Sequence, residues 1–192
     1  MNSPIQSGLS ASLRFLLKAA LLTMFAGAAW AETSEVTPAG FLVSIQEDIN
    51  APPSAVFGAL ITPSRWWNPE HSYSSDARNL SLEPVGGGCF CERWATGSVE
   101  HARVVLVKQD ALLRMTGSLG PLQSMAVSGV LEFTTTLQEG RTLLKLRYRV
   151  NGTAGSKLDQ WAGPVEGMLT DQAVRLKRVV ETGRPEPVTP VN

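Results

Sequence analysis

Three residues of different chemistry, Glu92, His101 and Arg103, lie on two segments whose alternating polarity predicts neighbouring strands. A turn through residues 95–98 would pair Trp94 with Val99, Glu92 with His101 and Phe90 with Arg103. A carboxylate, an imidazole and a guanidinium on one apolar face could orient a ligand carbonyl or act as general acid and base. Two alternatives stay open: a buried ion-pair cluster that satisfies itself, and the opposite strand parity, which puts all three on the surface.

A cluster of aromatic and imidazole side chains precedes these strands: Trp66, Trp67, His71 and Tyr73, in a segment that also holds Pro63 and Pro69. The prolines favour a loop or a short helix. Such a segment could form the entrance to a pocket for an apolar ligand, and simple packing beneath a loop is the alternative.

Further lining residues follow from period-two alternation in later strands and from a helical stripe near the C-terminus. Tyr148 is the one most suited to present a polar tip to a ligand. Glu92 and His101 are the candidates for catalysis. The complete predicted ligand-binding set is Trp66, Trp67, Tyr73, Phe90, Glu92, Trp94, His101, Arg103, Met115, Phe133, Tyr148, Trp161, Val165 and Met168.

No cofactor or metal site is predicted. His71, Asp76, Glu92 and His101 do not have the spacing of a metal motif. No Ser-His-Asp pattern or nucleotide fingerprint occurs, and the glycine run 86–88 leads into a strand rather than a helix, which indicates a turn or a bulge.

The two cysteines, Cys89 and Cys91, are separated by one residue. In an extended strand, residues two apart have Cα atoms about 7 Å from each other, at the limit of disulfide geometry. A bridge would therefore need a bulge in the strand. We predict two packed thiols, with a disulfide or a redox pair as the alternatives.

The N-terminus has the pattern of a secretory signal peptide. Residues 1–31 contain Arg14 and Lys18, no acidic residue, and then an apolar run over residues 19–29. This run is shorter than the roughly 20 residues that span a bilayer. It ends in Ala29-Trp30-Ala31, so we predict cleavage after Ala31 and a periplasmic or secreted protein. An uncleaved membrane-anchoring helix is the alternative.

Removing residues 1–31 leaves 161 residues, enough for one domain, with a net charge of −2. Such a charge gives no electrostatic reason to bind nucleic acid, and we expect no stable membrane insertion after cleavage. The expected organisation is a linker at 32–39, a domain at 40–182 and a flexible proline-rich tail at 183–192. No oligomeric state is predicted.

The order of elements predicts an α+β fold with a curved antiparallel sheet of about seven strands around a long C-terminal helix. Two short helices are expected after the first strand, the first at residues 54–61. The strands are expected at 41–49, 79–83, 89–94, 99–108, 112–119, 126–137 and 141–150, and the long helix at 158–181, with Pro164 in its first turn or at a kink.

This order resembles the helix-grip fold of the START-like (SRPBCC) superfamily. The segment at 51–57 looks like the opening of that superfamily, and the segments at 64–67, 76–83, 87–92 and 119–122, together with the final helix, look most like its bacterial polyketide-cyclase-like or activator-of-heat-shock-ATPase-like group. The resemblance spans about residues 40–182. It implies a cavity between the sheet and the last helix, while the cysteine pattern of a Rieske cluster is absent.

The leading hypothesis is therefore an exported protein that holds a hydrophobic or amphipathic small molecule in that cavity. A cyclase or dehydratase acting on a polyketide-like or aromatic substrate, with His101 and Glu92 as acid and base, is the enzyme alternative. A third hypothesis is an interaction protein of the cell envelope, which would need an exposed apolar patch.

Overall fold

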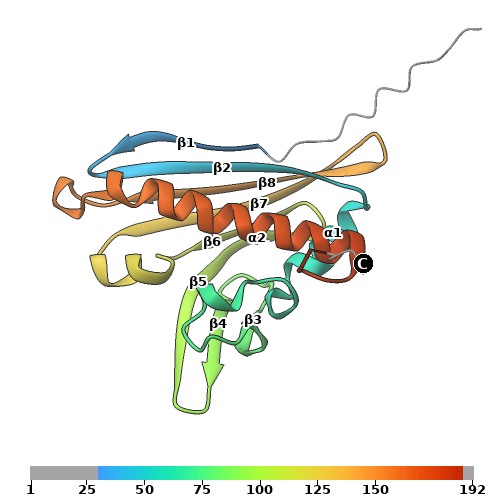
Figure 1. The fold of residues 1–192 in the computed structure, drawn as a ribbon, viewed down its shortest axis with the longest axis horizontal. Coiled ribbons are helices and arrows are strands. Elements are labelled where there is room, and N and C mark those ends of the chain that lie inside the picture. The colour runs from blue at the N-terminus through green and yellow to red at the C-terminus, as the bar shows by residue number, and fades with distance from the viewer. Residues whose placement is uncertain (1–29, 188–192) are drawn as a thin grey trace, which may run out of the picture.

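The computed structural model describes residues 30–187. Eight antiparallel strands form one sheet in the order β1-β2-β8-β7-β6-β5-β4-β3, and α2 lies across one face of it (Figure 1). The strands are β1 Trp30–Thr37, β2 Gly40–Ile49, β3 Leu80–Leu82, β4 Cys89–Trp94, β5 Gly97–Lys108, β6 Leu112–Thr116, β7 Ser128–Gln138 and β8 Arg141–Asn151; the helices are α1 Pro53–Leu60 and α2 Ala162–Thr182. The predicted helix-grip α+β fold is confirmed.

The core forms because alternating strand residues meet the apolar stripe of α2. On β8, Leu144, Leu146 and Tyr148 are buried while the residues between them are more exposed. Leu169 and Leu176 of α2 pack into the same cluster. Pro164 lies in the first turn of α2, where its missing N–H costs little.

The N-terminal edge of the sheet differs from the prediction. Residues 32–37, expected to be a linker, belong to β1, which pairs with β2 from Trp30↔Gln46 to Thr37↔Gly40. The sheet therefore has eight strands rather than seven. The polar and largely exposed residues of β1 conceal its strand character, because an edge strand can be held by backbone pairing with little apolar burial. The predicted signal peptide falls mainly on residues outside the described range.

A segment of short turns connects β2 to β3. Helix α1 is the first of the two expected short helices, and 3-10 turns at Pro63–Arg65 (η1), Pro69–His71 (η2) and Ala77–Asn79 (η3) take the place of the second. Prolines begin α1, η1 and η2, where a fixed φ suits the first helical position. This segment carries the predicted aromatic cluster.

Strand β5 contains two irregularities that the alternation pattern does not reveal. The pairing with β4 shifts between Phe90↔Ala102 and Cys91↔Glu100, so His101 is an extra residue on β5. The pairing with β6 shifts between Val104↔Met115 and Leu106↔Arg114. Each β-bulge reverses the inward-outward parity of the strand beyond it.

No helix among residues 30–187 is long and apolar enough to cross a membrane. Beyond α2, the chain turns at Gly183, whose φ of 80° is in the left-handed region that glycine adopts freely. Glu186 then pairs with Arg175 at 2.8 Å, which brings the start of the expected flexible tail back against the helix.

Candidate functional site

Glu92 and His101 form a buried carboxylate–imidazole pair. Their side chains are 0% and 5% exposed, and His101 Nε2 lies 3.1 Å from Glu92 Oε2. The carboxylate also accepts the backbone N–H groups of Tyr73 at 3.0 Å and Ser74 at 2.6 Å. Both carboxylate oxygens are thus hydrogen-bonded, which offsets the cost of burying the charge.

The surroundings fix the charge states of this pair. Burial raises the pKa of Glu92, but the hydrogen bonds from Ser74, Tyr73 and His101 outweigh burial and leave the pKa below its usual value. Burial also lowers the pKa of His101, and the attraction of Glu92 only partly opposes this effect. At neutral pH we therefore expect an ionised Glu92 beside a neutral His101, whose Nε2 carries the proton.

His101 Nδ1 is then an acceptor without an internal partner. It makes no hydrogen bond to any residue in the range 30–187. Within that range, the one fully enclosed side-chain nitrogen or oxygen atom that lacks a partner is Glu47 Oε1, so His101 Nδ1 is not sealed in the core. His101 lines an open cleft, and Nδ1 can accept a hydrogen bond from a molecule there.

The cleft has a volume of about 550 Å³. Its walls are the 67–73 segment, the 119–122 segment that begins the 3-10 helix η4 (Gly120–Met125), and the N-terminal part of α2 with the residue before it. Most of the lining is apolar, with a few polar groups, as in typical small-molecule sites. The lining residues are Trp67, Glu70, His71, Ser72, Tyr73, His101, Leu119, Gly120, Pro121, Leu122, Trp161, Pro164, Val165 and Met168.

Part of the predicted ligand-binding set gathers around this cleft: Trp67, Tyr73, His101, Trp161, Val165 and Met168. Tyr73 is 52% exposed, and its hydroxyl donates a hydrogen bond to the carbonyl of Gly120 at 3.1 Å. Its ring centre lies 5.9 Å from that of His101. Tyr73 therefore connects two walls of the cleft at its rim.

Another part of the set belongs to the packed core between the sheet and residues 60–67. Trp66, Phe90, Met115 and Phe133 surround a void of only about 10 Å³, which has no room for an organic ligand. This part of the interior is therefore packed core, and the usable space lies beside the start of α2.

Tyr148 also faces inward, but its hydroxyl is already satisfied. It donates to the carbonyl of Gly117 at 3.0 Å and accepts the N–H of Leu119 at 3.0 Å. Burial raises the pKa of Tyr148 to about 12. A Cβ atom at Gly129 would lie 2.6 Å from this hydroxyl, so glycine is required there. Tyr148 is a structural residue that fixes the start of the 119–122 wall.

The predicted position of Arg103 inside the pocket is wrong. The hairpin turn uses Ala95 and Thr96, with Trp94 opposite Gly97, and the bulge at His101 then reverses the parity. Arg103 consequently points outward and pairs with Glu100, whereas Glu92 and His101 meet as expected.

The predicted place of Trp94 in the pocket is also wrong, because Trp94 lies at the turn end of the hairpin. Trp94 is half-buried and packs over Gly97, where an added Cβ would lie 2.5 Å from the indole ring. The tryptophan therefore covers the end of the hairpin and does not line the cleft.

Buried polar residues of α2, which were not among the predicted site residues, hold the 67–73 wall in place. Gln172 accepts the N–H of Asn68 at 2.8 Å, and its amide lies 3.1 Å from His71 Nδ1. Arg175 donates to the carbonyl of Trp66 at 2.9 Å. Their position within the apolar stripe of α2 was the available signal, because polar residues on a buried face need partners.

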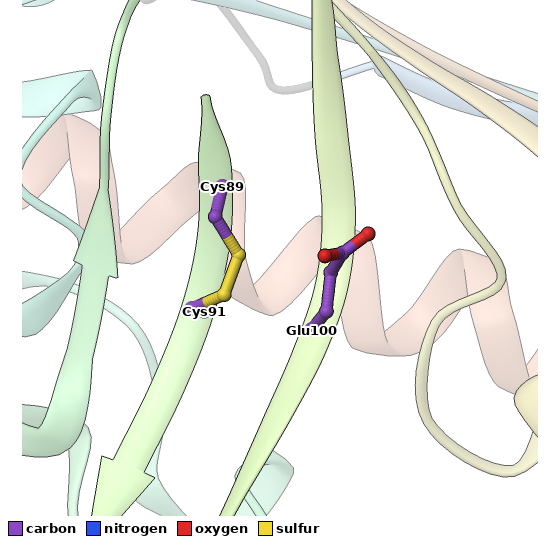
Figure 2. Close-up of side chains that lie close together, drawn as sticks. All are labelled: Cys89, Cys91 and Glu100. Carbon is purple, nitrogen blue, oxygen red and sulfur yellow. A yellow bond between two sulfur atoms is a disulfide. The ribbon is translucent and has the colours of Figure 1, made fainter. Parts of the chain in front are cut away.

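The cysteine prediction is also wrong, because Cys89 and Cys91 form a disulfide (Figure 2). Their Cα atoms are 5.3 Å apart, closer than in a regular strand, and the ladder is irregular at this point, although the extra residue lies on β5 and not on the strand of the cysteines. Glu100 is close to both sulfur atoms, and these three are the residues within 30–187 that approach the spacing of a metal site. With the sulfurs bonded to each other, they do not form one.

Comparison with known proteins supports the fold but does not assign the chain to a family. No family model and no curated protein matches the sequence. Similar solved structures include a protein from Arthrobacter aurescens, with TM-score 0.58 and 12% identity over 85% of this chain and 98% of that one. CalU16 from Micromonospora echinospora has TM-score 0.55 and 16% identity, covering 83% and 88% of the two chains. The Aha1 dimer from Colwellia psychrerythraea has TM-score 0.54 and 15% identity, covering 74% and 97%. The shared feature is the helix-grip architecture.

Proposed function

We propose that this protein binds a hydrophobic or amphipathic small molecule in the cleft beside the N-terminal part of α2. The single observation that carries the proposal is the pairing of a largely apolar cleft of about 550 Å³ with His101, whose Nδ1 makes no hydrogen bond to a described residue. Apolar walls supply affinity, and a polar group fixes orientation. A ligand with a planar apolar body and one O–H or N–H group fits this arrangement.

The charge states of Glu92 and His101 favour a contact between His101 and an uncharged polar group of the ligand. Glu92 accepts a hydrogen bond from His101 Nε2, and its carboxylate also accepts the backbone N–H groups of Tyr73 and Ser74. At His101 the site therefore offers a neutral acceptor, and Glu70 is the one carboxylate among the lining residues. The ring of Phe90, whose centre lies 4.9 Å from that of the imidazole, packs against His101 from the core.

The amphipathic dye 1-anilinonaphthalene-8-sulfonate provides a direct test of this cleft. We expect saturable binding with enhanced fluorescence, and we expect Met168→Trp to weaken it because the larger indole occupies part of the cleft. Leu137→Trp is the matched control, because it adds the same indole at an exposed position outside the cleft. Equal binding by wild-type protein and Met168→Trp would refute the proposed site.

The Glu92–His101 pair also favours a second candidate function, a cyclase or dehydratase reaction. A neutral imidazole oriented by a carboxylate is suited to remove a proton from a bound substrate. His101→Ala should then abolish turnover of a polyketide-like or aromatic substrate while the protein still folds and binds the dye. Parallel loss of folding, binding and turnover would assign His101 a structural role.

We also propose export, with the mature chain beginning at Glu32. Cleavage after Ala31 would leave residues 32–37 of β1 paired with β2. The Cys89–Cys91 disulfide supports an oxidising compartment, where such bonds persist. N-terminal sequencing of the protein from a periplasmic fraction should begin at Glu32. An intact N-terminus on protein that remains in the cytoplasm would contradict export.

A further inference from the structure

The disulfide lies directly behind the candidate site. On β4, Cys89 and Cys91 alternate with Phe90 and Glu92, so the sulfur atoms lie on the face of the strand opposite to the site. Figure 2 shows the bridge running along β4, beside Glu100 of the neighbouring strand. The disulfide thus spans Phe90, whose ring packs against His101.

The bulge that orients His101 occurs at the same step of the ladder. Phe90 pairs with Ala102 and Cys91 pairs with Glu100, which leaves His101 as the extra residue. As a result, the consecutive residues His101 and Ala102 are both buried. In a regular ladder, consecutive side chains point to opposite faces, so one of these two would lie on the outer face.

The disulfide also changes the length of β4 at this step. Its Cα atoms are 5.3 Å apart, against about 6.6–6.8 Å for residues two apart in a regular strand. This contraction occurs at the same step of the ladder at which β5 carries its extra residue.

We propose that the Cys89–Cys91 disulfide holds the β-bulge that turns His101 toward the cleft, so that its reduction removes the polar centre of the site. Reduction by a dithiol proceeds by thiol–disulfide exchange. The protein disulfide gains two electrons and two protons to give two thiols, while the reductant closes to its own disulfide. β4 can then extend, the ladder can become regular, and His101 leaves Glu92.

The consequence for ligand binding rests on the proposed function, but the position of His101 can be tested without any ligand. The chain contains two histidines, so an NMR titration gives two imidazole signals, which His71→Asn assigns. The protein is measured oxidised, reduced with dithiothreitol, and as Cys89→Ser/Cys91→Ser. Thiol alkylation and mass spectrometry confirm the redox state, and the dispersed spectrum reports the fold.

In the oxidised protein the pKa of His101 should lie below its ordinary value of about 6.5. In the reduced protein and in the double variant it should rise toward that value, with the rest of the fold intact. Identical His101 titrations in all three samples would overturn the proposal. Global unfolding of both the reduced protein and the double variant would overturn it too, because the disulfide would then support the whole domain rather than the bulge.

If dye binding fails in the oxidised wild-type protein while the His101 titrations still differ, the proposed function is wrong and the disulfide–bulge coupling stands. If dye binding persists while the titrations are identical, the proposed function stands and the disulfide–bulge coupling is wrong.

Discussion

The β2–β8–β7 part of the sheet and the β4–β5 hairpin are built from similar strands but behave differently. The β2–β8 and β7–β8 ladders run without a break from Gly40↔Asn151 to Ile49↔Thr142 and from Ser128↔Asn151 to Gln138↔Arg141. Strand β5 instead shifts register against both of its neighbours. The regular ladders form the apolar core, whereas the irregular hairpin brings an imidazole to the cleft and a buried carboxylate against it.

The contrast indicates how a small fold can combine stability with a polar site. A regular ladder keeps every second side chain in the core, which leaves few places for polar groups. A bulge places an extra side chain on the inner face, and here that side chain is His101.

The largest expected effect comes from truncating the regular region. Leu146→Ala on β8 removes a fully buried side chain, so the free energy of unfolding should fall by about 2–5 kcal/mol. Lys145→Ala, an exposed neighbour on the same strand, is the control. Urea denaturation followed by circular dichroism measures both. A loss at Leu146 no greater than at Lys145 would show that this ladder does not dominate stability.

Glu92→Gln should have a smaller effect on stability and a clear effect on His101. The amide cannot replace a carboxylate that accepts from Tyr73, Ser74 and His101, so we expect a loss of about 1–3 kcal/mol in urea denaturation. Removing the negative charge should also lower the pKa of His101 further, since Glu92 raises it.

Glu132→Gln is the matched control for Glu92→Gln. It loses an ion pair with Arg114, whose side chain is 41% exposed, and should cost less than about 1 kcal/mol. Equal losses in the free energy of unfolding for the two variants, with no change in the titration of His101, would contradict a buried carboxylate–imidazole pair.

The two regions also differ in how well the sequence predicts which side chains are buried. Alternation along β7 and β8 and the stripe on α2 predict which residues are buried, because each register is unbroken. The same reasoning misplaces Arg103, since a bulge leaves no trace in an alternation pattern. It also misses β1, which has few apolar residues, and the cleft wall at 119–122, which becomes a wall only when Tyr148 anchors Leu119.

The pH dependence of the free energy of unfolding should report on the burial of His101 in the site. Burial lowers the pKa of His101 in the folded protein, so the unfolded chain takes up its proton first. Stability should be full above about pH 6.5 and fall as the pH decreases from there toward the folded pKa. His101→Gln should flatten this slope in urea titrations between neutral and mildly acidic pH. An unchanged slope would mean that His101 is not buried as a neutral group.

The smallest expected effect concerns Glu47, a carboxylate in the regular region. Glu47 is 1% exposed; Oε1 has no partner among the described residues, and Oε2 lies 3.3 Å from Lys177 Nζ. Burial raises the pKa of Glu47 despite Lys177. Glu47→Gln should therefore gain stability over wild type as the pH rises above about 4.3, the ordinary carboxyl pKa. A variant less stable than wild type at neutral pH would assign Lys177 the stronger influence.

The most direct test of the account is the tautomer of His101 at neutral pH, read from a long-range ¹H–¹⁵N correlation spectrum of the oxidised protein. We predict a neutral ring protonated at Nε2, with Nδ1 unprotonated and free to accept a hydrogen bond in the cleft. A doubly protonated imidazolium, or a ring protonated at Nδ1, would contradict the proposed site.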